Sequence, residues 1–176
     1  GQGNRGLRQL FAPSVHRSQT RRRLLTQLPL FPSAADGVWT AYCDGASRGN
    51  PGPASFGLVV VDPADRTVRE LGVAIGINTN QVAEYEGLIR ALEELSRAGA
   101  RRARVVTDSQ FVVKQFNGEY RAKDERMKAL LARAKAVAAR FDALTVQHVM
   151  RSGHAHNTRA DALANRALDE AKKKTH

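Results

Sequence analysis

The sequence predicts an α/β domain in which helices flank a mixed five-stranded sheet. Two observations indicate this fold. Three apolar strand patterns come first with only turn residues between them, which is typical of an antiparallel meander. Strand and helix patterns then alternate, which indicates two more strands reached by crossover connections. The expected sheet is therefore a meander of three strands plus two further strands.

The strands of the meander are bounded by turn residues. Residues 38–44 and 55–62 are predominantly apolar, and the segment between them, GASRGNPGP at 45–53, is rich in turn formers. A second turn at 63–66 leads into a third strand at 67–77. The second and third strands are therefore expected to form a hairpin.

Helical periodicity begins after the meander. Apolar residues recur at helical spacing over residues 80–98, and Gly99 is expected to end this helix. The other predicted elements are a strand at 103–107, helices at 109–116 and 124–141, a strand at 143–149 and a helix at 157–172.

Residues 1–37 differ from the rest of the chain. They contain six Arg, no Lys and a single acid, Asp36, and they show no sustained apolar period. Such a segment predicts a disordered, Arg-rich tail before a globular domain at 38–176. The whole chain carries a net charge of +11 at pH 7. This charge favours a polyanionic partner, and the alternative is a basic surface that is merely solvated.

The composition disfavours several classes of protein. Cys43 is the single cysteine, so we expect neither an intrachain disulfide nor a cysteine-based zinc site, and we interpret it as a small buried thiol. No apolar run approaches the roughly 20 residues that span a bilayer, and no secretory signal is visible. We expect a cytoplasmic monomer without a membrane partner.

Four carboxylates interrupt the apolar patterns. Asp44 and Asp108 are expected to end strands, whereas Glu84 and Asp161 are expected in the first turns of helices, on the faces that pack against the sheet. Each has a local alternative: Asp44 as a turn residue, Asp108 as an N-cap, and the other two as partners of a helix dipole. Taken together, four converging carboxylates in a basic protein favour divalent metal and phosphodiester chemistry.

Four motifs connect these acids to a known family. They are YCDGASRGNPGP at 42–53, TNQVAEY at 79–85, TDSQ at 107–110 and NTRADALAN at 157–165. In this order and spacing, over roughly residues 38–172, the chain resembles the type 1 ribonuclease H family. The resemblance implies a ribonuclease H-like fold. It also implies endonucleolytic hydrolysis of the RNA strand of RNA–DNA hybrids, which leaves 5′-phosphate and 3′-hydroxyl ends.

The resemblance implies a role for each acid in a two-metal mechanism. Asp44 would bridge two Mg²⁺ ions in the active site, for which Mn²⁺ could substitute. Asp161 would hold the ion that activates the attacking water. Glu84 and Asp108 would hold the ion on the leaving-group side.

The resemblance also implies substrate contacts. The backbone near Gly45, together with Glu84, would sense the ribose 2′-hydroxyl. Minor-groove contacts are implied for Asn80, Gln81 and Gln110, and contacts to a phosphate of the DNA strand for Asn50 and Thr79. Three turn residues would let the backbone approach the substrate or would have a structural role alone: Gly49, Gly52 and Pro53.

The chain departs from the family pattern in two places. The loop before the last acid, 149–156, is short, and Arg151 falls where many members carry a His that is thought to help product release. His154 is the candidate for that role, followed by His156, and the alternative is an exposed loop His. A basic handle after the short helix is also absent. Substrate grip is therefore expected from Arg121, Lys123 and Arg126, from the tail, or from Lys172–Lys174, whose alternative role is to stabilise a helix C-terminus.

The tail contains the peptide QLPLF. It resembles the peptide by which bacterial replication proteins bind the sliding clamp, with apolar side chains for a pocket and a Gln for its rim. The residues concerned are Gln27, Leu28, Leu30 and Phe31. Alternatives are packing of these residues onto the domain, nonspecific nucleic-acid binding through the arginines at 21–23, and an organelle transit peptide.

Two other functions stay open on the sequence. One is a catalytically silent module that binds hybrids, although such a binder gains nothing from acids that face a phosphate backbone. The other is a nuclease of the same fold with another duplex substrate.

Overall fold

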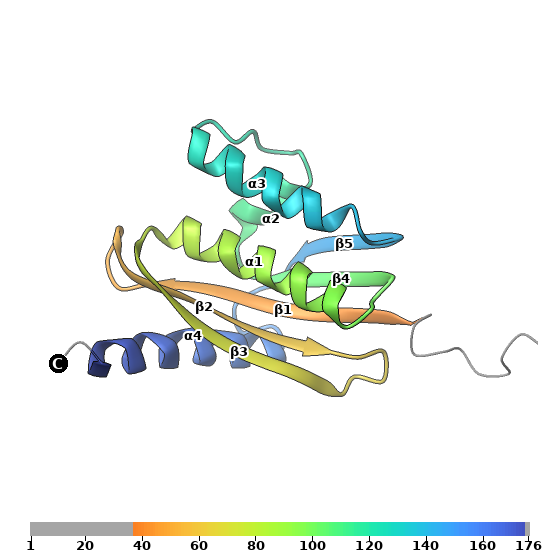
Figure 1. Ribbon diagram of the computed structural model, residues 1–176, viewed down its shortest axis with the longest axis horizontal. Coiled ribbons are helices and arrows are strands. Elements are labelled where there is room, and N and C mark those ends of the chain that lie inside the picture. Colours follow the sequence, from red (N-terminus) through yellow and green to blue (C-terminus); the bar gives the residue numbers. More distant parts are fainter. Residues whose placement is uncertain (1–36, 175–176) are drawn as a thin grey trace, which may run out of the picture. The chain divides into compact units, whose positions relative to one another are not determined.

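A computed structural model describes residues 37–174 of the chain, and its strands form one mixed sheet (Figure 1). The order across the sheet is β3-β2-β1-β4-β5. The first three strands pair antiparallel, whereas β4 runs parallel to β1 and β5 parallel to β4. The strands are β1 (Val38–Ser47), β2 (Gly52–Val61), β3 (Thr67–Asn78), β4 (Arg102–Thr107) and β5 (Ala143–His148). The predicted meander of three strands plus two is confirmed.

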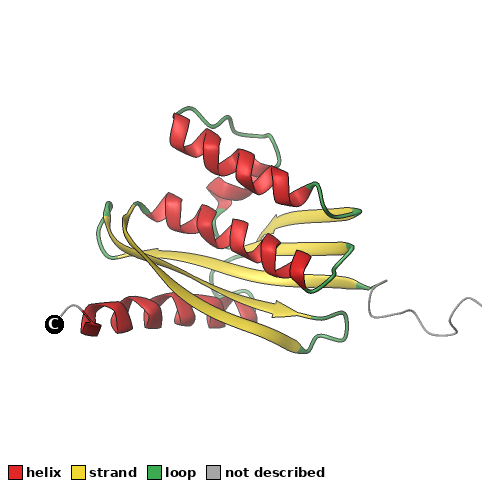
Figure 2. Ribbon diagram, viewed as in Figure 1, coloured by secondary structure: helices red, strands yellow, loops and turns green. Residues whose placement is uncertain are grey.

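Helices cover both faces of this sheet (Figure 2). α1, α2 and α3 lie on one side, and α4 lies on the other side against β2 and β3. Their bounds are α1 (Asn80–Arg97), α2 (Gln110–Phe116), α3 (Glu125–Ala138) and α4 (Ala155–Lys174). None of the helices in the described part of the chain is long and apolar enough to cross a membrane.

Local chemistry explains where three of these helices begin. The side chains of Thr79, Ser109 and Asp124 accept hydrogen bonds from backbone N–H groups in the first turns of α1, α2 and α3, respectively. These caps satisfy donors that the helix itself leaves unpaired. The apolar stripe of α1 then packs on β1 and closes the main core, in which Cys43 is 1% exposed, as the buried-thiol interpretation predicts.

Several predicted boundaries were wrong. The turn expected at 45–53 is shorter, because β1 continues to Ser47 and β2 already begins at Gly52. Backbone pairing of Gly45 with Phe56 extends the ladder through the glycine-rich segment. At the other end of the chain, α4 begins at Ala155, before the expected residue 157, and α3 ends at Ala138, before the expected residue 141. The predicted tail lies outside the described residues, except for Gly37.

Candidate active site

Two of the predicted acids lie side by side on neighbouring parallel strands. Cys43 of β1 pairs with Thr107 of β4, so the residues that follow them, Asp44 and Asp108, lie at the same level of the sheet. Asp44 is buried at 2% exposure, and the Asp108 side chain is 10% exposed. The sequence predicted Asp44 at the end of its strand. This prediction was wrong, because β1 continues to Ser47 and Asp44 lies within it.

Asp44 is the electrostatic centre of the site. Its Oδ2 atom is buried and has no hydrogen-bond partner among the described residues. Burial, followed by the nearby charge of Asp108 and a side-chain contact with Asp161, raises the pKa of Asp44 to about 9. A positive charge beside such a carboxyl group stabilises its ionised form and lowers its pKa again.

Two glycines next to Asp44 let the helices with the other acids approach. Gly57 lies opposite Asp44 in the β1–β2 pair, and a Cβ atom there would lie 2.0 Å from the backbone oxygen of Ala160 in α4. Gly45 follows Asp44 in the chain, and a Cβ atom there would lie 2.4 Å from the backbone nitrogen of Glu84 in α1. Side chains at either position would push the acid-bearing helices away from the strand.

Glu84 is held in place by two hydrogen bonds. Ser109 Oγ donates to Glu84 Oε2 at 2.6 Å, and Asn80 Nδ2 donates to Glu84 Oε1 at 2.9 Å. Burial raises the pKa of Glu84, and the charge of Asp108 raises it further, while these two hydrogen bonds act in the opposite direction. The structure therefore places Glu84 within the electrostatic reach of Asp108.

Asp161 reaches the cluster from the other side of the sheet. Its half-buried side chain interacts with Asp44, and Asn165 Nδ2 donates to its Oδ1 at 3.3 Å. Together, β1, α1, β4 and α4 thus supply the four acids.

The local alternatives for three of the acids lose support. Ser109, and not Asp108, caps α2. Glu84 is the fifth residue of α1, and Asp161 is the seventh residue of α4, so neither lies in the first turn as predicted. A helix dipole acts mainly on the first turn and explains these two positions poorly.

Arg151 is a member of the site that the sequence interpretation did not assign. Its Nε atom donates to Asp108 Oδ2 at 3.1 Å, and its charge also acts on Asp44 and Asp161. The guanidinium group partly neutralises the acids. The one signal in the sequence was the position of Arg151 in the loop before Asp161, where many members of the family carry a His.

The candidate product-release residue, His154, packs against Tyr42 of β1. The rings of His154 and Tyr42 are stacked with centroids 4.6 Å apart, and the His154 and His156 rings lie 5.3 Å apart. His156 Nε2 is 3.8 Å from a carboxylate oxygen of Asp65. His154 is exposed in the loop before α4, as its alternative predicts, whereas His156 is half-buried within α4, and both rings pack with Tyr42.

The predicted substrate contacts gather at the start of α1. Asn80 donates its backbone N–H to Asn50 Oδ1 at 3.2 Å, and its side chain contacts Glu84. Thr79 accepts the capping bond from Val82, which gives it a structural role as well. Gln81 and Gln110 are exposed near the N-termini of α1 and α2, and Gly45 is buried below.

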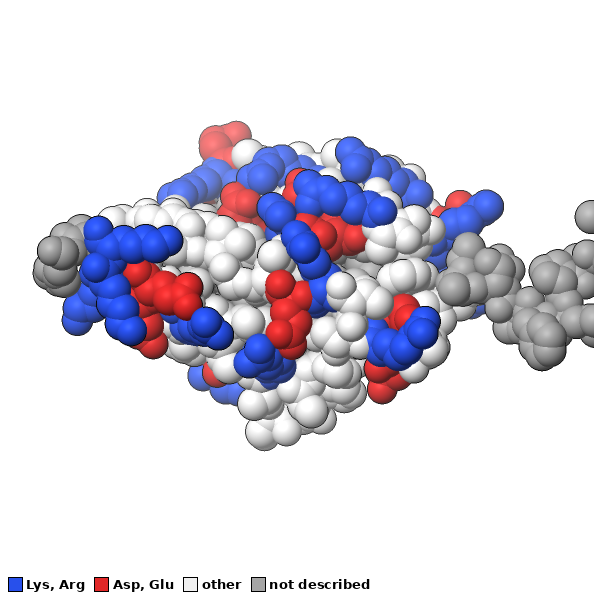
Figure 3. Space-filling model, turned by 60° about the horizontal axis from the view of Figure 1, so that its bottom comes forward, with Lys and Arg blue, Asp and Glu red and all other residues white. Residues whose placement is uncertain are grey.

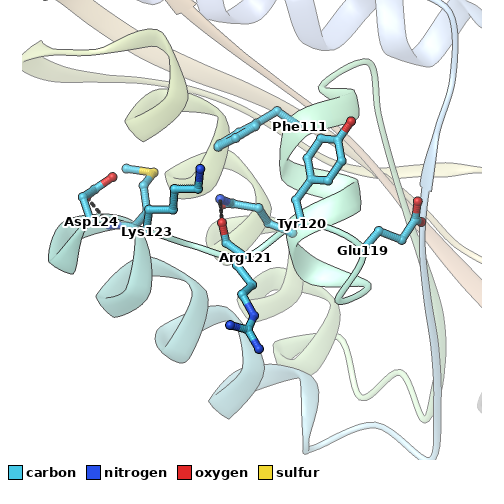
Figure 4. Close-up of a pocket in the computed structure, with 8 residues that line it drawn as sticks. Phe111, Glu119, Tyr120, Arg121, Lys123 and Asp124 are labelled. Atoms are coloured by element: carbon cyan, nitrogen blue, oxygen red, sulfur yellow. Dashed lines mark hydrogen bonds between the residues drawn. The ribbon is translucent and has the colours of Figure 1, made fainter.

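A cavity of about 510 Å³ adjoins α2, where the basic handle is absent. Phe111, Tyr120 and Met127 supply its apolar lining, and Arg121 and Lys123 its basic groups. Figure 4 shows Lys123 extending toward the Phe111 ring, whereas Arg121 points away from it. Arg126 instead donates a hydrogen bond to the side chain of Asn78.

The four acids fit a divalent cation in charge and donor type. They offer only oxygen atoms, which Mg²⁺ and Mn²⁺ prefer, and Asp44 presents a buried oxygen without a partner. Within residues 37–174, no three acidic, histidine or cysteine side chains are already arranged as ligands of one ion. Arg151, which contacts Asp108, would compete with a cation for this carboxylate.

The sheet order, the helix placement and the acid cluster define an α/β domain of the ribonuclease H-like class. The chain belongs to the reverse transcriptase-like family, whose sequence model matches residues 42–167. The motif resemblance to ribonuclease H is thus supported at the level of the family.

Three relatives illustrate this similarity. Ribonuclease HI of Halobacterium salinarum is 46% identical over 131 residues, which are 74% of this chain and 64% of that protein. Its crystal structure superposes with a TM-score of 0.72, at 45% identity, over 76% of this chain and 99% of that chain. The bifunctional protein Rv2228c of Mycobacterium tuberculosis is 45% identical over 129 residues, which are 73% of this chain and 35% of that protein.

The third relative was solved with nucleic acid. LC11-RNase H1, whose crystal structure is a complex with an RNA/DNA hybrid, is 39% identical, with a TM-score of 0.70 over 76% of this chain and 98% of that chain. The chain spans less than two thirds of the length of the first two relatives, at 64% and 35%. The clamp-binding prediction for Gln27, Leu28, Leu30 and Phe31 falls outside the described residues.

Proposed function

We propose that this chain hydrolyses the RNA strand of RNA–DNA hybrids and leaves 5′-phosphate and 3′-hydroxyl ends. The observation that carries this proposal is the cluster of four acids around the buried, unpartnered Oδ2 atom of Asp44. A domain that only binds nucleic acid would bind it more weakly with a negative cluster on its binding face. The similarity to proteins named ribonuclease H adds independent support.

The acids would hold two Mg²⁺ ions, for which Mn²⁺ is a substitute. Asp44 would serve both ions, Asp161 the one on the side of the attacking water, and Glu84 and Asp108 the other. Bound divalent cations lower the pKa of water and stabilise negative charge on phosphoryl oxygens. Ser109 and Asn80 orient the Glu84 carboxylate, which restricts the freedom of this ligand before a cation arrives.

Hybrid recognition would use the end of α1 and its neighbours. Asn80 and Gln81 would contact the minor groove together with Gln110 of α2, while Asn50 and Thr79 would bind a phosphate of the DNA strand. The wide minor groove of an A-like duplex exposes base edges and 2′-hydroxyl groups to such side chains. The cavity with Arg121 and Lys123 extends the basic surface beyond α2.

Other parts of the proposal rest on the sequence alone. We propose a cytoplasmic monomer whose QLPLF peptide, with Gln27, Leu28, Leu30 and Phe31, docks on a bacterial sliding clamp. Removal of primer RNA or of RNA in R-loops would then be the cellular task. His154 stays a candidate for product release, although its stacking on Tyr42 favours a role in shaping the loop.

Substrate choice is the direct test of this function. End-labelled RNA–DNA hybrid, duplex DNA and duplex RNA of one sequence are incubated with the full chain and Mg²⁺, and the ends of the products are determined. The proposal expects cleavage of the RNA strand of the hybrid only, with 5′-phosphate products. Cleavage of duplex RNA or DNA at a similar rate would instead indicate a nuclease of the same fold with another substrate.

A further inference from the structure

A groove between the end of β3 and the last turns of α4 has an unusual combination of side chains. It has a volume of about 530 Å³ and an apolar lining of Pro53, Ile77, Leu168 and Ala171. Arg48 and Lys172 stand at its sides. The groove lies outside the four-acid site.

A β-bulge turns Ile77 into this groove. Along β3, Leu71, Val73 and Ile75 all pack against the main core, so strand alternation would place Ile77 there too. The pairing of β3 with β2 shifts register between Pro53 and Ser55, where Gly76 adopts a positive φ of 74°. A bulge of this kind re-aims the following side chain. Ile77 is consequently 69% exposed beside α4.

The apolar lining spans three elements. Ile77 and Pro53 are cross-strand partners in β3 and β2, and Leu168 of α4 is buried at 3% exposure as the floor. Isolated exposed apolar residues are ordinary, whereas several that share one groove are typical of a binding surface.

The charge around the groove is positive. Of the two charged residues that line it, Arg48 is paired with Asp169, whereas Lys172 is followed by Lys173 and Lys174 in the last turn of α4. Lys172 forms no ion pair with any residue in the described part of the chain. A favourable helix C-terminus accounts for lysines in the last turn, but it does not account for an apolar groove beside them.

We propose that this groove binds an acidic peptide segment of a partner protein, with large apolar side chains placed on Ile77 and Leu168. Negative residues of the peptide would lie near Lys172 and the two lysines that follow it. Nucleic acid is the less suitable occupant, because the described residues that line the groove include no aromatic side chain for base stacking and no polar side chain besides its two cations.

The position of the groove permits binding during catalysis. Leu168 lies seven residues after Asp161 on α4, about 10 Å along the helix axis. Ile77 precedes the substrate contacts Thr79 and Asn80 but is directed toward α4. A partner bound here would hold the enzyme near its substrate without covering the four acids.

Fluorescence anisotropy on the full chain tests the proposal without any hybrid present. The probe is a fluorescein-labelled peptide in which a run of acidic residues precedes Leu, Phe and Ile. Matched peptides carry Ser in place of the apolar residues or Lys in place of the acids. We expect saturable binding of the first peptide, at least about tenfold weaker binding of both matched peptides, and a similar loss in Ile77→Glu and in Lys172→Glu.

Two control variants separate the groove from general charge effects. Val68→Glu changes another exposed apolar residue of β3, at 48% exposure, and Arg140→Glu removes an exposed cation two residues after the end of α3. Both should bind the peptide as the wild type does, and Ile77→Glu should still cleave hybrids.

Three results would overturn the proposal. The first is an absence of saturable peptide binding below about 1 mM. The second is equal binding of the Ser-containing peptide, which would reduce the interaction to charge. The third is an equal loss of single-stranded DNA binding in Ile77→Glu, which would make the groove part of the nucleic-acid surface. Figure 3 shows basic side chains at this end of the molecule, with acidic side chains between them.

Discussion

Gly57 lies directly opposite Asp44 in the β1–β2 pair, and the space where its side chain would stand is occupied by the Ala160 carbonyl of α4. The close approach of helix and strand brings the next residue, Asp161, to the Asp44 carboxylate. A glycine without any chemistry of its own therefore determines whether two of the four acids meet.

We predict that Gly57→Ala destabilises the protein by roughly 1–3 kcal/mol, because the new Cβ atom clashes with backbone that cannot move away cheaply. Hybrid cleavage should fall with it, since α4 and Asp161 must shift. Urea denaturation and a cleavage assay at saturating Mg²⁺ measure both effects. Gly87→Ala is the matched control, because its Cβ atom would approach Phe56 Cβ at 3.3 Å and would meet Asp44 O and Cys43 Cβ at the ordinary contact distances of 3.7 and 3.8 Å. Equal effects of the two substitutions would contradict this explanation.

The stability of the metal-free protein should decrease as pH rises from about 4 to about 9. The folded state raises the pKa of Asp44 to about 9 and also raises that of Glu84, so the folded state binds more protons than the unfolded chain in this interval. Ionisation of these groups as pH rises therefore favours unfolding. Asp62 and Glu70 have lowered pKa values in the folded state, so their ionised forms contribute to stability, and this contribution is lost only in more acidic solution.

Melting temperatures in EDTA at pH 5.5 and 8.5 test this dependence. We expect a fall on the order of 5 °C for the wild type and a smaller fall for Asp44→Asn, which cannot ionise. Saturating Mg²⁺ should restore most of the loss at pH 8.5, because it binds the ionised acids. A wild type that is more stable at pH 8.5 in EDTA would show that the acids are not mutually repulsive.

Arg151 should oppose cation binding. Its guanidinium group contacts Asp108 and acts on Asp44 and Asp161, so a divalent ion must displace it and overcome its charge. Arg151→Ala is therefore expected to lower the Mg²⁺ concentration at half-saturation severalfold in calorimetric titrations, and Arg151→Lys should have a smaller effect. Weaker Mg²⁺ binding in Arg151→Ala would indicate that the arginine helps to hold the site in shape.

The Arg-rich tail should contribute to the salt dependence of hybrid binding. Deletion of residues 1–25 removes all six arginines of the tail. Each phosphate contact adds about 0.9 to the steepness of log K for hybrid binding against log salt concentration. If several of the arginines contact phosphates, the deletion should reduce the steepness by about 0.9 for each of them. Anisotropy titrations at a series of KCl concentrations measure it. An unchanged slope would remove the tail from the binding surface.

The sequence predicted the succession of strands and helices and the four acids, because both are visible in local patterns, whereas the order of the strands across the sheet comes from the structure. Asp44, Glu84, Asp108 and Asp161 stand out as charges in apolar periods. Strand ends were less predictable, since the glycine-rich segment after Asp44 reads as a turn, whereas backbone pairing extends β1 to Ser47. Backbone hydrogen bonds to a neighbouring strand leave no mark on local composition.

Other features depend on contacts between distant segments. Gly57 looks like any glycine within a strand, and its importance appears only when α4 packs on it. Arg151 lies in a short loop with no periodicity, and its partner Asp108 is 43 residues away in the chain. The bulge that exposes Ile77 arises from an irregular register between two strands, which alternation alone does not predict.

Substitution of Asp44 tests the central claim most directly. Cleavage and binding of an end-labelled RNA–DNA hybrid are measured for wild type, Asp44→Asn and the control Asp142→Asn, whose side chain is 58% exposed on the surface. We predict that Asp44→Asn loses cleavage by on the order of 10³-fold or more while it binds the hybrid at least as tightly as the wild type, and that the control is unaffected. If Asp44→Asn still cleaved at the wild-type rate, or if the wild type bound hybrid tightly but cleaved none with Mg²⁺ or Mn²⁺, the four acids would not be a catalytic site.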